Sequence, residues 1–345
     1  MSDIDILNSK LIFSDNKYPI DLAYGKMGIC IYLFYLSRLE EKDEYWHVAN
    51  KLLDDIIAKI PNHKDISVDM GLAGIGIGLT YLVKEKFVGG DINDVLEEVD
   101  SYIFKSIAFL NIKNSNLPKS ILIQLIYYFY LRLTNLKCSS SKYLYQELII
   151  KMIEMLQHNL QTNFFKEHSV FSAQDYQLPS FLYVISKIYK LNIYNQRITK
   201  IIEEFYVQIV STIPILHANR LFLLFGLLNL KPYLLNHQKE INFQTKLLKE
   251  IIDIEHIINV EFKNKDIFVN DGLSFVYILL FMIQKNYPEY RIVFDPQSIY
   301  SRIISSEAWN TMLNKDYYLN LRKGLYDGFP GVNLVIMHIK KYFKL

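Results

Sequence analysis

A glycine-rich stretch is the first feature of the sequence that could do chemistry. Residues 69–85 read DMGLAGIGIGLTYLVKE, with four glycines inside an apolar run. Glycines at this density can form a loop whose backbone N–H groups bind a phosphate. Such loops continue into a Lys-Ser or Lys-Thr pair or follow the spacing G-x-G-x-x-G, and this stretch does neither. Its uncharged part is also shorter than the ~20 apolar residues that cross a bilayer. We therefore expect neither a nucleotide site nor a membrane span here.

The two cysteines, Cys30 and Cys138, are the next candidates for chemistry. Two are too few for a disulfide framework, and neither lies in a C-x-x-C or Cys-His cluster of the kind that binds zinc. We expect two reduced cysteines in the core.

Composition narrows the possible partners and the compartment. The 345 residues include 38 Lys and Arg against 36 Asp and Glu, so charge does not favour a nucleic-acid or anionic-membrane partner. The first residues, MSDIDILNSKLIF, carry acids where a signal peptide has bases, and no apolar run reaches membrane length. With 51% hydrophobic residues and no Pro/Gly/Ser-rich linker, residues 1–345 are expected to form one cytoplasmic domain.

Helical periodicity extends along the whole chain, in two kinds of segment. Amphipathic segments with one charged face are residues 48–60, 144–160, 198–210 and 247–258. Segments that are apolar nearly all round are residues 28–36, 72–83, 121–131, 179–188, 221–230, 273–283 and 332–339. A helix without a polar face is buried on all sides. Alternation of the two kinds therefore predicts an all-α, double-layered α/α toroid of about seven helix-hairpin repeats, and closure of the ring favours a monomer.

The glycines occupy corresponding positions in this arrangement. A G-x-x-G pattern begins three of the apolar helices, with Gly25 and Gly28, Gly71 and Gly74, and Gly328 and Gly331. Glycine there allows a positive φ in the entering turn and a close approach of crowded helix ends. The glycines of residues 69–85 are thus interpreted as structural.

These glycine motifs resemble the lanthionine synthetase C-like (LanC-like) family, and the resemblance extends over nearly the whole chain. Residues 69–82 look like that family's second repeat and residues 324–336 like its last. The resemblance implies a double-layered α/α toroid of seven helix pairs. It also implies thioether ring closure, in which a peptide cysteine adds to a dehydrated serine or threonine, activated by a zinc ion on two cysteines and one histidine.

This sequence departs from the family's pattern at the implied zinc site. The resemblance places Asn270 and Asp271, before Gly272, where the family has Cys-His-Gly, and it places His217 and Asn219 at the cysteine and glycine of Cys-x-Gly. Tyr176 stands where the family has its proton-handling histidine. No counterpart of the family's acidic residue is found in the third repeat. We therefore expect a divergent member without metal or other cofactor, in which these five residues line the substrate cavity.

Each candidate also has a structural interpretation. His217, before an apolar helix, is typical of a cap or a satisfied buried histidine, and Asp271 is well placed to N-cap the next helix. A weak metal site of His217 with Asp271 is a minor alternative, because Asn270 is a poor zinc ligand. Tyr176 can simply pack, with its hydroxyl reaching water.

Three functions remain open from the sequence. The first is a zinc-free LanC-like protein that binds a modified peptide in its central cavity and assists maturation, as a scaffold or partner of a modifying enzyme. The second is an active, metal-independent thioether cyclase in which Tyr176, His217 or Asp271 supplies acid/base help. The third is a carbohydrate-active toroid that would rely on Asp175, Asp271 and Asp327.

Overall fold

The computed structural model describes residues 2–12, 18–112, 117–135, 139–160, 162–167, 169–262 and 266–343, and their regular structure is helical throughout. Contacts divide the chain into two compact units, residues 1–110, 267–269 and 300–345 (unit 1) and residues 111–266 and 270–299 (unit 2). None of the described helices is long and apolar enough to cross a membrane. Cys138 lies outside the described residues.

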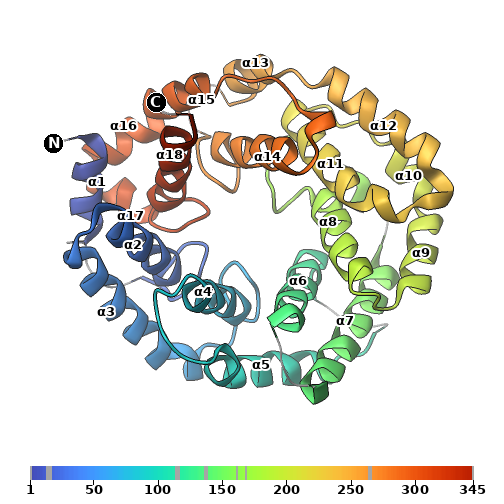
Figure 1. Ribbon diagram of the computed structural model, residues 1–345, viewed down its shortest axis with the longest axis horizontal. Coiled ribbons are helices and arrows are strands. Elements are labelled where there is room, and N and C mark those ends of the chain that lie inside the picture. Colours follow the sequence, from blue (N-terminus) through green and yellow to red (C-terminus); the bar gives the residue numbers. More distant parts are fainter. Residues whose placement is uncertain are drawn as a thin grey trace. The chain divides into compact units, whose positions relative to one another are not determined.

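Unit 1 contains the helices from both ends of the chain (Figure 1). They are α1 (Asp3–Ile12), α2 (Lys26–Glu40), α3 (Asp43–Lys59), α4 (Leu72–Lys84), α5 (Ile92–Ala108), α16 (Glu307–Asn314), α17 (Asp316–Leu321) and α18 (Phe329–Phe343). Helix α15 (Pro296–Ile304) crosses the boundary between the units. The apolar helices α2, α4 and α18 begin where the G-x-x-G motifs predict.

Unit 2 contains the central part of the chain. Its longer helices are α6 (Lys119–Asn135), α7 (Ser139–Asn159), α8 (Gln177–Lys190), α9 (Asn195–Glu204), α11 (His217–Leu230), α12 (Gln238–Ile251) and α14 (Leu273–Asn286). Shorter ones are α10 (Tyr206–Ser211) and α13 (Ile254–His256), the latter continued by a π-helical turn, η5 (Ile257–Glu261). Helices α8 and α11 pack side by side, with α9 beside α8 and α12 beside α11 (Figure 1).

Burial follows the predicted alternation of helix types. In α11 every residue from Leu221 to Leu230 is buried, whereas α9 buries only Ile198, Ile201 and Ile202. The apolar helices thus form the interior layer of each unit, and the amphipathic ones expose their charged face.

Two of the predicted amphipathic helices are interrupted. The segment 198–210 breaks at Phe205, which leaves helical geometry and packs its ring on Phe165, with the ring centroids 5.3 Å apart. The segment 247–258 breaks after Ile251, because Ile252 is extended and the Asp253 side chain starts a new helix by accepting the His256 N–H at 2.9 Å. Periodicity alone did not reveal either break.

A shared loop geometry begins four of the apolar helices. In each, the N–H of the first helical residue donates to the carbonyl of the residue seven positions earlier, at 2.8–3.0 Å. The donor and acceptor pairs are Lys26 and Pro19, Leu72 and Asp65, Leu273 and Asp266, and Phe329 and Arg322. A glycine precedes each of these helices: Gly25, Gly71, Gly272 and Gly328. The returning carbonyl satisfies an N–H group that the helix itself leaves unpaired.

The second glycine of each complete motif accommodates the same loop. A Cβ atom on Gly74 would lie 1.9 Å from the Val68 carbonyl oxygen, and one on Gly331 would lie 1.9 Å from that of Leu325. The expected positive φ is wrong at these motifs: among the described glycines only Gly90 has one. Glycine is therefore required here for close backbone approach.

This geometry predicts that Gly74→Ala lowers the free energy of unfolding by roughly 1–3 kcal/mol or more, because the methyl group meets backbone that cannot swing aside. The matched control is Gly89→Ala, where an added Cβ meets nothing within 4 Å and a change within about 0.5 kcal/mol is expected. Urea unfolding of the two variants measures the difference. Equal stabilities would show that the loop before α4 can relax.

Candidate functional site

The N-terminus of α11 is held by two carboxylates from other loops of unit 2. The Glu167 carboxylate accepts the Ile215 and Leu216 N–H groups, the second at 3.3 Å. Glu261, at the end of the π-helical turn, accepts the N–H groups of the next two residues, His217 at 2.6 Å and Ala218 at 3.0 Å. Negative charge is favourable at this end of a helix. Because the chain's own carboxylates occupy it, this helix end is not open to an anionic ligand.

His217 is the first residue of α11, and its ring is engaged within unit 2. Its Nδ1 accepts the Asp253 N–H at 2.9 Å, and Nη1 of Arg220 lies 3.3 Å from both ring nitrogens. Burial, and then the Arg220 charge, lower the pKa of His217 below its ordinary value. The imidazole is therefore neutral near pH 7 and has the intramolecular partner expected of a structural histidine.

His217, His256 and Glu261 form a group of possible metal ligands, with their ligand atoms within 4.8 Å of one another. Asp271, the partner suggested by the sequence, is not in this group. Both Glu261 oxygens already accept backbone N–H groups, and Nδ1 of His217 accepts a third. A cation bound here would have to compete with these bonds and with the positive charge of Arg220. The contacts favour a helix cap over a metal centre.

Tyr176 and Asn219 are the most deeply buried of the predicted site residues, 1% and 0% exposed. Tyr176 immediately precedes α8, and its ring meets that of Phe222 edge-on. Asn219 donates from Nδ2 to Oε2 of Glu167 at 2.7 Å. Burial, reinforced by the Glu167 charge, raises the pKa of Tyr176 far above its ordinary value. The phenol is therefore a hydrogen-bond donor rather than a general base, and the sequence-based expectation that its hydroxyl reaches water is wrong.

Asn270 and Asp271 lie in the loop before α14. The Asn270 carbonyl accepts the Ala173 N–H at 2.9 Å, which joins this loop to the one before α8. The N-cap residue of α14 is Gly272, so the prediction that Asp271 is the N-cap is wrong by one position. The returning carbonyl of Asp266 accepts the first helical N–H and takes the place of a side-chain cap.

Aromatic side chains pack together at the starts of α8, α11 and α14. Phe222 contacts Phe275 with a centroid separation of 5.0 Å, and Phe171 contacts both Phe262 and Phe275, at 5.4 and 5.9 Å. With Tyr176 against Phe222, these five rings form one cluster. Sequence reasoning missed it, although Phe222 and Phe275 stand three residues after Asn219 and Gly272, where complete motifs have their second glycine.

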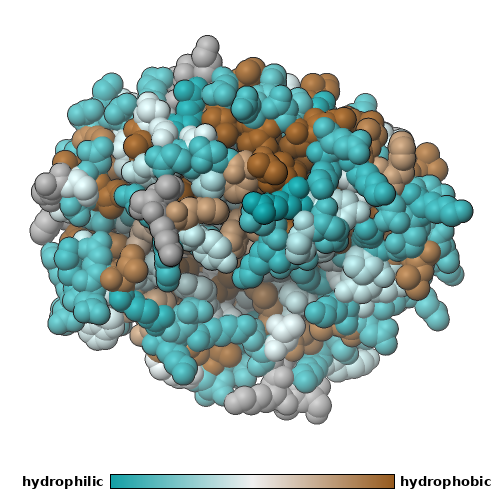
Figure 2. Space-filling view, turned by 45° about the horizontal axis from the view of Figure 1, so that its top comes forward, coloured by the Kyte–Doolittle hydropathy of each residue, from teal (hydrophilic) through white to brown (hydrophobic). Residues whose placement is uncertain are grey.

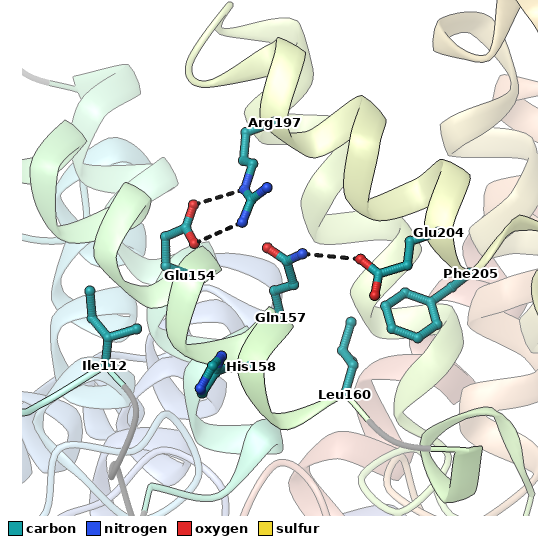
Figure 3. A pocket seen from close by; sticks show the side chains of 8 residues that line it. All are labelled: Ile112, Glu154, Gln157, His158, Leu160, Arg197, Glu204 and Phe205. Atoms are coloured by element: carbon teal, nitrogen blue, oxygen red, sulfur yellow. Dashed lines mark hydrogen bonds and ion pairs between the residues drawn. The ribbon is translucent and has the colours of Figure 1, made fainter.

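A separate surface pocket of about 500 Å³ lies over α7 and α9, where Glu154 and Gln157 of α7 face Arg197 and Glu204 of α9 (Figure 3). Arg197 pairs with Glu154 through two hydrogen bonds of 3.1 and 3.3 Å, and Gln157 donates to Glu204 at 3.1 Å. Burial alone would raise the pKa of Glu154, but hydrogen bonds from Arg197 and Tyr194 outweigh it and lower that pKa. The Arg197 and Glu154 charges neutralise each other, whereas the Glu204 carboxylate is hydrogen-bonded to an uncharged amide and keeps its negative charge. The lining residues are Ile112, Glu154, Gln157, His158, Leu160, Arg197, Glu204 and Phe205.

Exposed apolar side chains flank the capping carboxylates of α11. Ile215, whose N–H donates to Glu167, has a side chain that is 79% exposed. Val260, which directly precedes Glu261, is 59% exposed. Hydrophilic residues predominate on the face in Figure 2, and apolar ones gather there in patches.

Among solved structures the chain resembles a protein described as nisin cyclase. The match covers 99% of this chain and 94% of that one, with a TM-score of 0.59 and 13% sequence identity. It confirms the predicted fold class, an all-α toroid, and supports the LanC-like fold that the resemblance implied. No protein-family model matches the chain, and no curated protein matches its sequence.

The capping arrangement predicts that Glu261→Gln lowers the free energy of unfolding by roughly 1–2 kcal/mol. The substitution removes the negative charge of Glu261 and one of its two oxygens that accept N–H groups of α11. Thermal and urea unfolding measure the loss. Glu255→Gln, on the exposed side of the same segment, is the control and should change stability by less than about 0.5 kcal/mol. Equal effects of the two substitutions would contradict the capping role.

Proposed function

We propose that the chain is a zinc-free LanC-like protein that binds a modified peptide and assists maturation of a ribosomally made peptide, as a scaffold or as a partner of a modifying enzyme. The observation that carries the proposal is the likeness to nisin cyclase along 99% of the chain. The name of that protein indicates peptide cyclisation, and we infer from it that this chain also binds a peptide. We infer further that the chain acts as a single, monomeric domain in the cytoplasm.

The cysteine within the described residues is not suited to bind zinc, and this supports the zinc-free part of the proposal. Cys30 is the cysteine that the described residues contain, and it lies fully buried in α2, with its thiol 3.4 Å from the Ala49 carbonyl oxygen. Burial raises the pKa of that thiol well above its ordinary range. Asn270, Asp271 and His217 stand at the positions matched to the zinc ligands, and carboxamides bind zinc poorly.

The second candidate is a metal-independent cyclase. In the neutral imidazole of His217 the acceptor nitrogen is Nδ1, which already accepts the Asp253 N–H, so proton transfer through this residue would require that bond to break. A peptide thiol with pKa near 8.5 is a few per cent ionised at neutral pH, so it can react slowly without zinc. Nothing comparable favours the carbohydrate-active alternative. Of its carboxylates, Asp327 lies 3.8 Å from Arg322 in unit 1, whereas Asp175 and Asp271 belong to unit 2.

A linear peptide with one dehydroalanine and one cysteine distinguishes scaffold from cyclase. Ring closure joins the sulfur to the β-carbon and moves a proton to the α-carbon, so the mass stays constant and the free thiol disappears. We expect calorimetry to show binding, and alkylation followed by mass spectrometry to show thiol loss at the protein-free rate. Faster thiol loss would favour the cyclase, and absence of binding would contradict both.

The zinc-free proposal predicts well under one zinc per chain by elemental analysis. A chelator should leave the melting temperature unchanged, because an ion that does not bind the native state cannot stabilise it. Stoichiometric zinc that is lost in Asp271→Ala would indicate that zinc binds at the positions implied by the family resemblance. Zinc that disappears in His256→Ala would instead place it at the His217, His256 and Glu261 group. Either result would overturn the zinc-free proposal.

A further inference from the structure

Buried polar atoms without a protein partner gather at the starts of α8, α11 and α14. Four of them belong to uncharged side chains: Nε2 of Gln174, Oη of Tyr176, Oδ1 of Asn219 and Oδ1 of Asn270. None has a hydrogen-bond partner among the residues that the structure describes. Most buried polar side-chain atoms in folded proteins are paired, and leaving one unpaired destabilises the fold. Four at neighbouring positions call for a common explanation.

Contacts within unit 2 place the segments that carry these four side chains next to one another. The hydrogen bond from Ala173 to Asn270 ties the residue before Gln174 to the loop before α14. Tyr176 meets Phe222, which lies one helical turn after Asn219 on α11, and Glu167 both accepts the Asn219 amide and adds its charge to the surroundings of Tyr176.

Exposure changes across this group of side chains. Gln174, Asn270 and the neighbouring Phe275 are partly exposed, whereas Tyr176 and Asn219 are buried. The group therefore extends from the surface into the interior of unit 2. A ligand that engages Tyr176 and Asn219 must enter past partly exposed side chains.

The chemistry of the four groups specifies a neutral ligand with both a donor and an acceptor. Tyr176 is protonated and offers its O–H. Asn219 offers Oδ1 as an acceptor, since its Nδ2 is committed to Glu167. Gln174 and Asn270 carry carboxamides, which can present either end. None of the four is charged, and the Glu167 oxygens already accept N–H groups. A secondary amide, with one C=O and one N–H, matches this set.

We propose that these residues bind a main-chain peptide group, with the Tyr176 hydroxyl donating to its carbonyl oxygen and Oδ1 of Asn219 accepting its N–H. Gln174 and Asn270 bind the adjoining backbone, and the aromatic cluster contacts apolar side chains of the ligand. The proposal rests on the proposed peptide-binding function and specifies which part of the peptide these residues bind. That part is backbone, so binding tolerates variation in peptide sequence.

Tyr176→Phe separates this role from a structural one. If the hydroxyl has no partner until a ligand arrives, its removal leaves the melting temperature of the unliganded protein unchanged or raises it. The same change weakens binding of the dehydroalanine and cysteine peptide roughly fivefold to tenfold, the loss of one hydrogen bond. The control is Tyr290→Phe, whose hydroxyl bonds to Lys231 at 2.8 Å and Thr245 at 3.1 Å. That change should lower the melting temperature and leave the affinity as it was.

N-methylation of the peptide, one backbone nitrogen at a time, provides the second measurement. One N-methyl position should weaken binding to the wild type by a similar factor, because it removes the N–H that Asn219 accepts. A further probe is N-methylacetamide, titrated to millimolar concentrations and followed by NMR of isotope-labelled tyrosine, with the Tyr176 signal assigned by its loss in Tyr176→Phe.

The outcomes separate this inference from the proposed function. If the peptide binds and Tyr176→Phe does not weaken its binding, the inference is overturned and the proposed function stands. The same conclusion follows if Tyr176→Phe lowers the melting temperature as much as Tyr290→Phe does. No peptide binding, with a saturable shift of the Tyr176 signal by N-methylacetamide, overturns the function and supports the amide site. If neither probe binds, both are overturned.

Discussion

The starts of the apolar helices impose the constraint on which each unit depends. A helix buried on all sides must begin in a loop that is itself confined, and its first N–H groups need acceptors that water cannot supply. In α2, α4, α14 and α18 the acceptor is the carbonyl seven residues earlier, and a glycine precedes the helix. In α11 the acceptors are the carboxylates of Glu167 and Glu261. The local sequence satisfies the first kind of start, whereas the second requires distant loops.

The two kinds of helix start have different chemical consequences. A loop closed by its own carbonyl and glycine consists of backbone and leaves no room for side chains, as the predicted 1.9 Å contact at Gly74 shows. Where the second glycine is missing, as at Phe222 and Phe275, a ring takes its position and joins an aromatic cluster. The helix starts of unit 2 in which the second glycine is missing therefore carry side chains at the positions where unit 1 carries backbone.

The sequence was sufficient for features that depend on local pattern and insufficient for those that depend on distant loops. Periodicity predicted the apolar helices, and the glycine spacing predicted where α2, α4 and α18 begin. Glu167 and Glu261 lie in no motif, and each acts on residues more than forty positions away. Tyr176, His217 and Asn219 were found through the resemblance, but their partners were not. The Asp253 cap that ends the predicted helix 247–258 also supplies the N–H for His217.

The aromatic cluster and the unpaired polar atoms explain each other in energetic terms. An unpaired buried atom costs roughly 1–3 kcal/mol, and full burial of a phenylalanine side chain contributes roughly 1.5–3 kcal/mol. Rings as well buried as Phe171, Phe222 and Phe262 can therefore hold the Tyr176 hydroxyl and Oδ1 of Asn219 in place although these atoms have no partner among the described residues. A side chain held this way cannot turn toward water to satisfy itself, so its bonding capacity stays directed at whatever enters the cluster. Replacement of any one ring by a small residue would release that restraint and would let water reach these atoms.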